Sequence, residues 1–281
     1  MKKLNASLDN HVFRFECFES VLELERVISG RKFSESWKCK SENFDDDIKD
    51  DSSWYGVSSL KEAYDLLKNG WQEATQKSAG MLNDLRQCGN REKVSFSNDV
   101  VGFCPNVPLS LMNVPNSMIN TAKKSVKNRV LNIIYFNTAS CGVSSKDMIK
   151  AGINIVNALI DVEKSGYRVN LTVGLSFCRD GNCYGAMVDI KNANQSLNLL
   201  KMMFPIAHSA WLRGIGFEWL YKSEAPYMSG NGQPLYVYLE DNNISVEDVE
   251  NKVFKGNTVM LDYKIAKNGV EEIKNVLKRK M

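Results

Sequence analysis

The sequence has few of the residues on which hydrolases and zinc sites depend. Only 2 of its 281 residues are histidine, whereas a zinc site normally uses histidine or cysteine ligands at close spacing. None of the motifs G-x-S-x-G, H-E-x-x-H or the P-loop lysine motif occurs. The chain therefore shows no nucleophile elbow, no zinc-protease helix and no nucleotide phosphate loop, which favours a non-catalytic function.

Long apolar runs and an excess of one charge are also absent. No stretch reaches the roughly 18 apolar residues of a transmembrane helix, and the amino terminus, MKKLNASLDNHVFRFE, lacks the apolar core of a signal peptide. We therefore expect a protein that is neither exported by that route nor membrane-spanning. With 36 basic and 33 acidic residues, the net charge of +3 does not by itself indicate a nucleic-acid partner.

The 7 cysteines are odd in number, scattered, and form no C-x-x-C pair. This usage predicts reduced thiols in a cytosolic compartment. Cys178 and Cys183 flank the turn RDGN and can face each other across a hairpin. A redox pair is the alternative there, whereas a zinc site would need two further ligands.

Residues 1–125 are predicted to be mostly helical. Ser59 stands three residues before Glu62, the spacing of a capping box, and the apolar face that follows predicts a helix over 60–69. A second amphipathic stretch, over 71–89, follows it.

Three other segments of this region are short or irregular. An aromatic alternation over 12–18 indicates a short strand or extended entry, followed by a helix that ends at Gly30. The acidic run SENFDDDIKDDSS, residues 41–53, is typical of a solvated loop. Residues 99–118 contain three prolines and predict a folded connector rather than a flexible linker, because its apolar side chains would be costly to leave in water. These side chains are Val101, Phe103, Val107, Leu109, Leu111 and Met112.

Residues 126–281 alternate between strand and helix patterns, which predicts an α/β fold with a doubly wound mixed sheet and one antiparallel hairpin edge. The expected strands are 130–136, 167–177, 183–191, 234–241 and 257–263. The expected helices are 144–166, a segment through SLNLLKMMFPIAHSAWLR that is interrupted at Pro205, and a terminal helix in GVEEIKNVLKRK.

This order of elements resembles the von Willebrand factor A-like fold, whose first strand ends in a metal-binding loop with the motif D-x-S-x-S. The comparable loop here is YFNTASCGVSS, with Asn137, Ala139 and Cys141 at the motif positions. A hard divalent cation prefers carboxylate oxygens, and these residues supply none. Moving the frame by one residue gives the hydroxyls of Thr138 and Ser140, and the resemblance implies that a later acidic residue, Asp241, could add a carboxylate.

A second resemblance is to an uncharacterised family carried by tailed phages and prophages. It rests on the segments WYGVSSLKEAYDLLKNGW, DVVGFCPNVPLSLMNVPNSM and FPIAHSAWLRGIGFEWL, between about residues 52 and 220. The resemblance implies a phage origin and action in the cytoplasm of a bacterial host cell. It implies no activity and no catalytic residues.

His208 and Arg213 form the remaining candidate pair. They could face an anionic ligand, with Arg213 as a fork donor and His208 as a hydrogen-bond partner or acid. Alternatively they lie at a helix end, where they cap carbonyl groups while the nearby aromatic residues fill the core.

Two basic stretches, AKKSVKNR at 122–129 and KNVLKRK at 274–280, could contact nucleic-acid phosphates. Both also fit a solvated linker and a helix terminus.

We therefore expect a non-catalytic binding or adaptor protein whose partner is a phage or host protein, with no cofactor and no membrane contact. The expected binding face comprises Asn137, Thr138, Ser140, Ser144, His208, Arg213 and Asp241, at the carboxyl ends of the strands. Two alternatives remain: a metal-assisted phosphoester-cleaving enzyme that uses Asp241 with the loop hydroxyls and a divalent cation, and a nucleic-acid-binding accessory protein.

Overall fold

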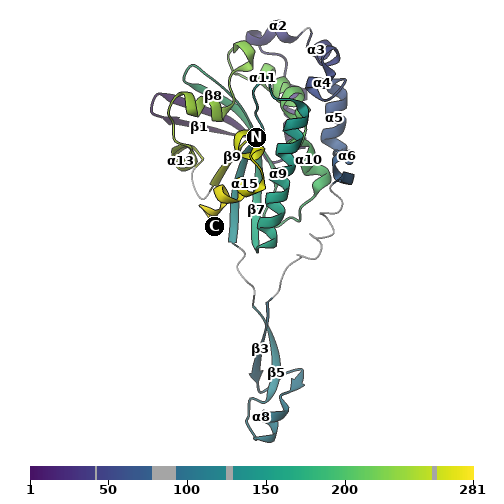
Figure 1. Ribbon diagram of the computed structural model, residues 1–281, viewed down its shortest axis with the longest axis vertical. Coiled ribbons are helices and arrows are strands. Elements are labelled where there is room, and N and C mark those ends of the chain that lie inside the picture. The colour runs from purple at the N-terminus through teal and green to yellow at the C-terminus, as the bar shows by residue number, and fades with distance from the viewer. Residues whose placement is uncertain (42, 78–92, 125–128, 255–257) are drawn as a thin grey trace.

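The computed structural model describes residues 1–41, 43–77, 93–124, 129–254 and 258–281. Its central feature is a six-stranded mixed sheet with the strand order β1-β2-β8-β7-β6-β9 (Figure 1). These strands are β1 (Lys2–Leu8), β2 (His11–Phe18), β6 (Arg129–Phe136), β7 (Tyr167–Arg179), β8 (Asn182–Lys191) and β9 (Thr258–Asp262). The predicted mixed sheet in an α/β chain is confirmed.

The centre of the sheet follows the predicted strand pattern. β6 lies parallel to both β7 and β9, while β7 and β8 form an antiparallel hairpin. Asp180 and Gly181 at its turn both have positive φ, 48° and 78°, as tight two-residue hairpin turns require. The dipeptide Asp-Gly therefore predicts this hairpin correctly.

The amino-terminal strands were only partly expected. β2 pairs in parallel with β8, and β1 pairs antiparallel with β2, so both extend the main sheet beyond the hairpin. The strand expected over 12–18 is present as part of β2, whereas no strand was expected over 2–8. The boundary expected near residue 125 lies outside the described residues.

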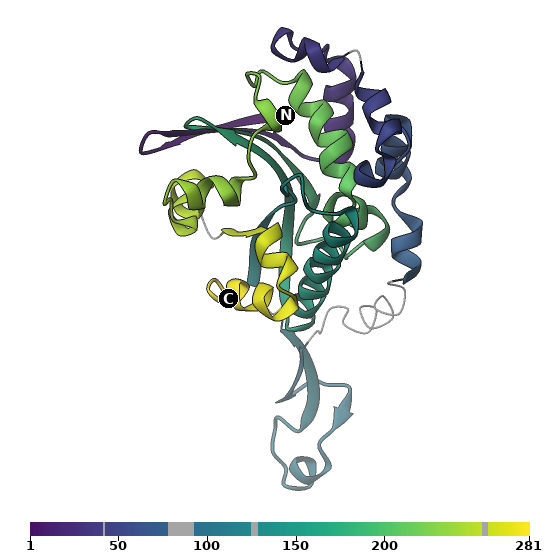
Figure 2. The ribbon, with the colours of Figure 1, turned by 45° about the horizontal axis from the view of Figure 1, so that its top comes forward.

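Most helices cover one face of the sheet, where a large apolar cluster joins strands and helices (Figure 2). These elements are α1 (Val21–Gly30), the 3₁₀ turn η1 (Glu35–Trp37), α2 (Lys38–Ser41), α3 (Phe44–Asp50), α4 (Ser52–Tyr55), α5 (Leu60–Asn69), α6 (Gln72–Lys77), α9 (Ser145–Lys164), α10 (Leu199–Ala207), the π-helical segment η2 (Trp211–Gly216), α11 (Phe217–Lys222), α14 (Tyr263–Lys267) and α15 (Val270–Lys278). The predicted helices at 60–69 and 144–166 are confirmed, while the stretch predicted at 71–89 continues beyond α6 outside the described residues.

The opposite face of the sheet has a smaller apolar cluster. It is covered by α12 (Leu235–Asp241), α13 (Val246–Asp248) and the π-helical segment η4 (Val249–Val253), and a short turn, η3 (Ser229–Asn231), precedes α12. Side chains late in the strands, such as Ile134, Phe136 and Met260, belong to this cluster. The polar residues Asn132 and Thr258, near the beginnings of β6 and β9, are not members of this cluster.

Three sequence interpretations need correction. Residues 235–241 form helix α12 rather than a strand, because Leu235, Tyr238 and Leu239 recur at helical spacing and are buried together. The acidic run contains helix α3 rather than a loop, since Phe44 and Ile48 are buried four residues apart. Helix α10 continues through Pro205 and ends before His208.

A further correction concerns the cysteines. Cys178 and Cys183 occupy opposite positions in the β7–β8 hairpin and are joined by a disulfide. The prediction of reduced thiols is therefore wrong for this pair.

Residues 93–124 form a separate three-stranded sheet, which we call the arm. It contains β3 (Lys93–Asp99), β4 (Cys104–Pro105), the short helix α8 (Val107–Leu111) and β5 (Met118–Lys124), in the strand order β3-β5-β4. Figure 1 shows the arm projecting away from the rest of the described chain, which we call the body.

Candidate functional site

The loop after β6 begins with two buried polar residues. The amide nitrogen of Asn137 donates to the carbonyl of Pro205 at 3.1 Å, and its side-chain oxygen has no hydrogen-bond partner among the described residues. The hydroxyl of Thr138 lies 2.7 Å from that of Ser176. Both residues are at most 2 % exposed, so neither presents its side chain to an external ligand.

Ser140 and Ser144 of the loop are less buried than Asn137 and Thr138, and both take part in hydrogen bonds with backbone N–H groups. Ser144 is the N-cap of α9: its hydroxyl accepts from the Asp147 backbone N–H at 3.1 Å and donates to the Asp147 carboxylate at 2.7 Å. The half-buried Ser140 accepts through its carbonyl from the backbone N–H of Val143. The helix amino terminus, which could hold an anion, therefore already has a carboxylate from its own chain.

Arg213 fastens this loop to the amino-terminal helices. Its guanidinium donates to the carbonyls of Trp54 and Val143, both at 2.5 Å, and lies 4.0 Å from the centre of the Trp54 ring. The Trp54 indole in turn donates to the carbonyl of Cys141 at 2.8 Å. Arg213 is 1 % exposed, and burial lowers its pKa to about 10. Its donors therefore hold the fold together rather than facing an anion.

His208 lies just after α10 in a similarly closed environment. Its Nδ1 accepts from the backbone N–H of Ala210 at 3.1 Å, and its ring meets the edge of Trp71 with the ring centres 4.6 Å apart. Burial lowers the pKa of His208 to about 4, partly opposed by the charge of Glu62. The imidazole is neutral at pH 7. His208 directly follows α10, whereas Arg213 lies within η2, so the helix-end interpretation describes the position of His208 only.

Asp241 does not lie at the end of a strand beside the loop, as the sequence predicts. It lies exposed at the end of α12 and accepts from the side chain of Gln233 at 3.3 Å. The beginning of α12 is the end near the loop, because the backbone N–H of Leu235 donates to Ser176 at 3.1 Å. At 1.5 Å per helical residue, Asp241 lies about 9 Å further along. In the described ranges, no group of three or more His, Cys, Asp or Glu residues has the arrangement of a metal site.

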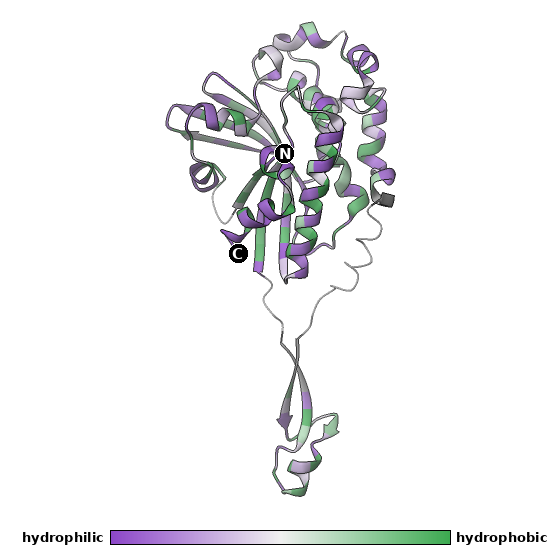
Figure 3. Cartoon of the chain, viewed as in Figure 1, coloured by the Kyte–Doolittle hydropathy of each residue, from purple (hydrophilic) through white to green (hydrophobic). Residues whose placement is uncertain are grey.

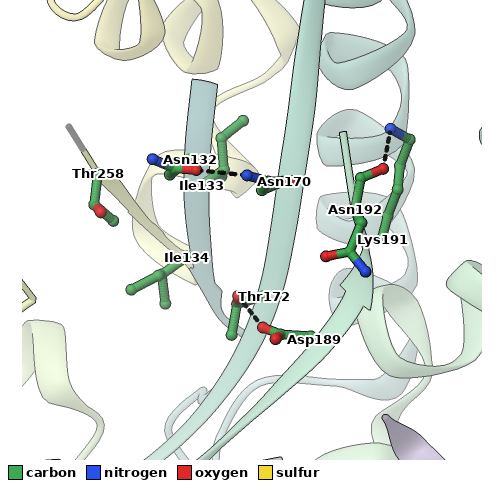
Figure 4. Close-up of a pocket in the computed structure, with 9 residues that line it drawn as sticks. All are labelled: Asn132, Ile133, Ile134, Asn170, Thr172, Asp189, Lys191, Asn192 and Thr258. Atoms are coloured by element: carbon green, nitrogen blue, oxygen red, sulfur yellow. Dashed lines mark hydrogen bonds between the residues drawn. The ribbon is translucent and has the colours of Figure 1, made fainter. Parts of the chain in front are cut away.

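The structure shows a polar cavity that the sequence interpretation missed (Figure 4). It has a volume of about 270 Å³ and is lined by residues of β6, β7, β8 and β9. Asn170 donates to Asn132 at 2.8 Å across β7 and β6, and Thr172 donates to Asp189 at 2.7 Å across β7 and β8. The available signal was the alternation in YRVNLTV, where Asn170 and Thr172 stand between buried apolar residues. These four side chains are hydrogen-bonded to one another in two pairs.

The arm presents the other unexpected surface. Seven large apolar side chains there, which we call the apolar tip, are each between 59 % and 80 % exposed. Figure 3 shows hydrophobic stretches, in green, along the arm. They are Phe96, Val100, Val101, Phe103, Val107, Leu111 and Met112. The sequence expectation that the apolar residues of 99–118 are covered is therefore wrong, with only Leu109 of the predicted set half-buried. The sequence signal for this surface is its charge: Asp99 is the only charged residue between positions 94 and 122.

The two basic stretches are placed differently. Residues 122–124 belong to β5, whereas 125–128 lie outside the described residues. In the second stretch, Lys274 forms ion pairs with Asp161 at 2.6 Å and Glu271 at 3.2 Å. Lys274 therefore fastens α15 to α9. None of the described helices is long and apolar enough to cross a bilayer.

Comparison with known families places almost the whole chain in one of them. The model of a domain of unknown function, DUF7192, matches residues 15–279. The chain belongs to the DUF7192 family. The matched region includes the arm and all of the main sheet except β1 and the first part of β2, so the arm lies within the family domain. No curated protein and no solved structure matches the chain.

Proposed function

We propose that this DUF7192 protein is a non-catalytic binding or adaptor protein that attaches to another protein through its arm. The observation that carries the proposal is the apolar tip, in which all seven side chains are more than half exposed. Exposed apolar patches of this size on folded proteins mark interaction surfaces. Aromatic residues and Met are enriched and charged residues depleted at the centres of protein interfaces, which matches the composition of the tip.

The buried polar residues of the loop after β6 support a binding function rather than a catalytic one. Asn137, Thr138 and Arg213 are buried, and the side-chain hydrogen bonds that they form are to groups of the fold. The phosphoester-cleaving alternative needs Asp241 beside the loop hydroxyls, and α12 carries Asp241 away from them. The binding site in this proposal is therefore the arm and not the loop face.

The proposal also includes two features that rest on sequence resemblance. The strand order β8-β7-β6-β9, with one antiparallel pair, is compatible with a von Willebrand factor A-like arrangement that has lost its ion ligands. The motif resemblance to phage and prophage proteins supports action inside an infected bacterial cell.

The test compares proteins captured from phage-infected bacteria by three tagged forms of the chain. The forms are wild type, the double variant Leu111→Asp and Met112→Asp in the tip, and Leu22→Asp on α1. Leu22 is the control because its side chain is 55 % exposed and lies in the body. A partner retained by wild type and by the control but lost from the tip variant supports the proposal. Equal retention by all three forms would show that the arm is not the binding surface.

A further inference from the structure

The arm has an open strand edge beside its apolar tip. In the order β3-β5-β4, β3 is an outer strand whose described ladder runs only to β5, from Lys93↔Lys124 to Asp99↔Met118. The outer edge of such a strand carries backbone N–H and C=O groups that can pair with another strand. An incoming strand would extend the arm sheet.

The sequence of β3, KVSFSND, is complementary to itself in the antiparallel direction. A twofold axis at Phe96 places residue 93, a lysine, opposite residue 99, an aspartate, of a second chain. The same register places the two Phe96 residues opposite each other and aligns Ser95 with Ser97. Opposite charges and aromatic pairs across antiparallel strands are favourable, whereas like charges are unfavourable.

The composition of the arm disfavours a highly charged partner. A partner of strongly acidic or basic character would find only Asp99 as a charged group between positions 94 and 122.

We infer that the partner of the arm is a second copy of this chain, joined by antiparallel pairing of the two β3 edges around Phe96. This inference rests on the proposed function, since it names the partner of the same arm. The resulting dimer has a continuous six-stranded arm sheet.

Sedimentation equilibrium of the purified full chain tests the inference. We expect a reversible dimer with a dissociation constant in the micromolar range for wild type and for the control Leu22→Asp. Phe96→Asp should weaken it at least 50-fold, because it places two carboxylates opposite each other on the axis. Circular dichroism melting checks that each variant remains folded.

A charge exchange tests the register. Asp99→Lys alone and Lys93→Asp alone each place like charges at both ends of the strand pair, and each should weaken dimerisation about tenfold. The double variant, Lys93→Asp with Asp99→Lys, should recover wild-type affinity within about threefold. Failure of the double variant to recover would overturn this register, since nonspecific apolar association does not depend on the pairing.

The outcomes separate this inference from the proposed function. A chain that remains monomeric at 100 μM overturns the dimer, and it leaves the proposed function intact if the tip variant still loses a captured protein. A dimer that Phe96→Asp does not weaken overturns pairing through the arm.

Discussion

The body and the arm differ in which side chains they bury. In the body, even charged groups are buried when they have partners: Glu16 accepts from Arg31 at 2.8 Å and from the Trp219 indole at 2.9 Å. In the arm, large apolar residues remain in water. Among the described residues, buried polar groups such as Glu16 have internal partners, whereas most of the exposed large apolar side chains lie in the arm.

Arg213→Ala should produce the largest loss of stability, because it removes two charge-assisted hydrogen bonds and leaves the Val143 carbonyl without that donor. Hydrogen bonds to charged groups contribute about 1.5–3 kcal/mol each, so we expect a loss of about 4 kcal/mol in the free energy of unfolding, measured by urea titration. Arg213→Lys keeps the charge without the planar fork and should lose an intermediate amount. A loss below about 1 kcal/mol would mean that Arg213 does not fasten the loop, and would reopen it as a ligand site.

The next largest effect is a dependence of the free energy of unfolding on pH, caused by the protonation of His208. Its pKa is about 4 in the folded chain, against about 6.5 when unfolded. The unfolded chain therefore binds the proton first as pH falls, so the contribution is complete above about pH 6.5 and is lost toward pH 4. The loss approaches 3 kcal/mol at 1.36 kcal/mol per pKa unit. The stability of His208→Gln, followed by denaturant unfolding from pH 7 to 4, should lack this component. Parallel curves for the two proteins would show that His208 is accessible to protons in the folded state.

Ser144→Ala should have a smaller effect. The Ser144 hydroxyl caps α9 through the backbone N–H of Asp147, and loss of an N-cap of this kind reduces stability by about 1 kcal/mol. Ser144→Thr retains a capping hydroxyl and serves as the control in thermal unfolding. A ligand role for Ser144 would instead predict a loss of binding with unchanged stability.

The smallest change in stability is expected in the arm. Leu111 is 80 % exposed, so Leu111→Ala should alter the free energy of unfolding by less than about 0.5 kcal/mol. The matched substitution in the body, Leu159→Ala on α9, removes a side chain that is 1 % exposed and should cost about 3 kcal/mol. Equal losses at the two leucines, in chemical unfolding of the monomer, would contradict the contrast between arm and body.

Local patterns were sufficient for several elements. The capping spacing of Ser59 and Glu62 gave helix α5, and Asp180-Gly181 gave the β7–β8 hairpin, because both depend on neighbouring residues. The segment at 235–241 was misassigned because a short apolar run fits both periods, and only its packing against β7 and η4 distinguishes them. The candidate site was predicted least well. Its residue types fit a ligand site, but Asn137, Thr138 and Arg213 are buried and form hydrogen bonds inside the fold.

The sequence by itself determined the mixed α/β class, the hairpin turn and the caps of the principal helices, since hydrophobic period and turn chemistry are local properties. Only the tertiary structure decided that residues 2–18 extend the main sheet, that Arg213 closes the loop after β6, and that the apolar residues of 99–118 stay exposed. These outcomes depend on which distant segments come together, and that choice sets the solvation of each side chain. The same apolar residue is core or interface according to whether another segment of the chain covers it.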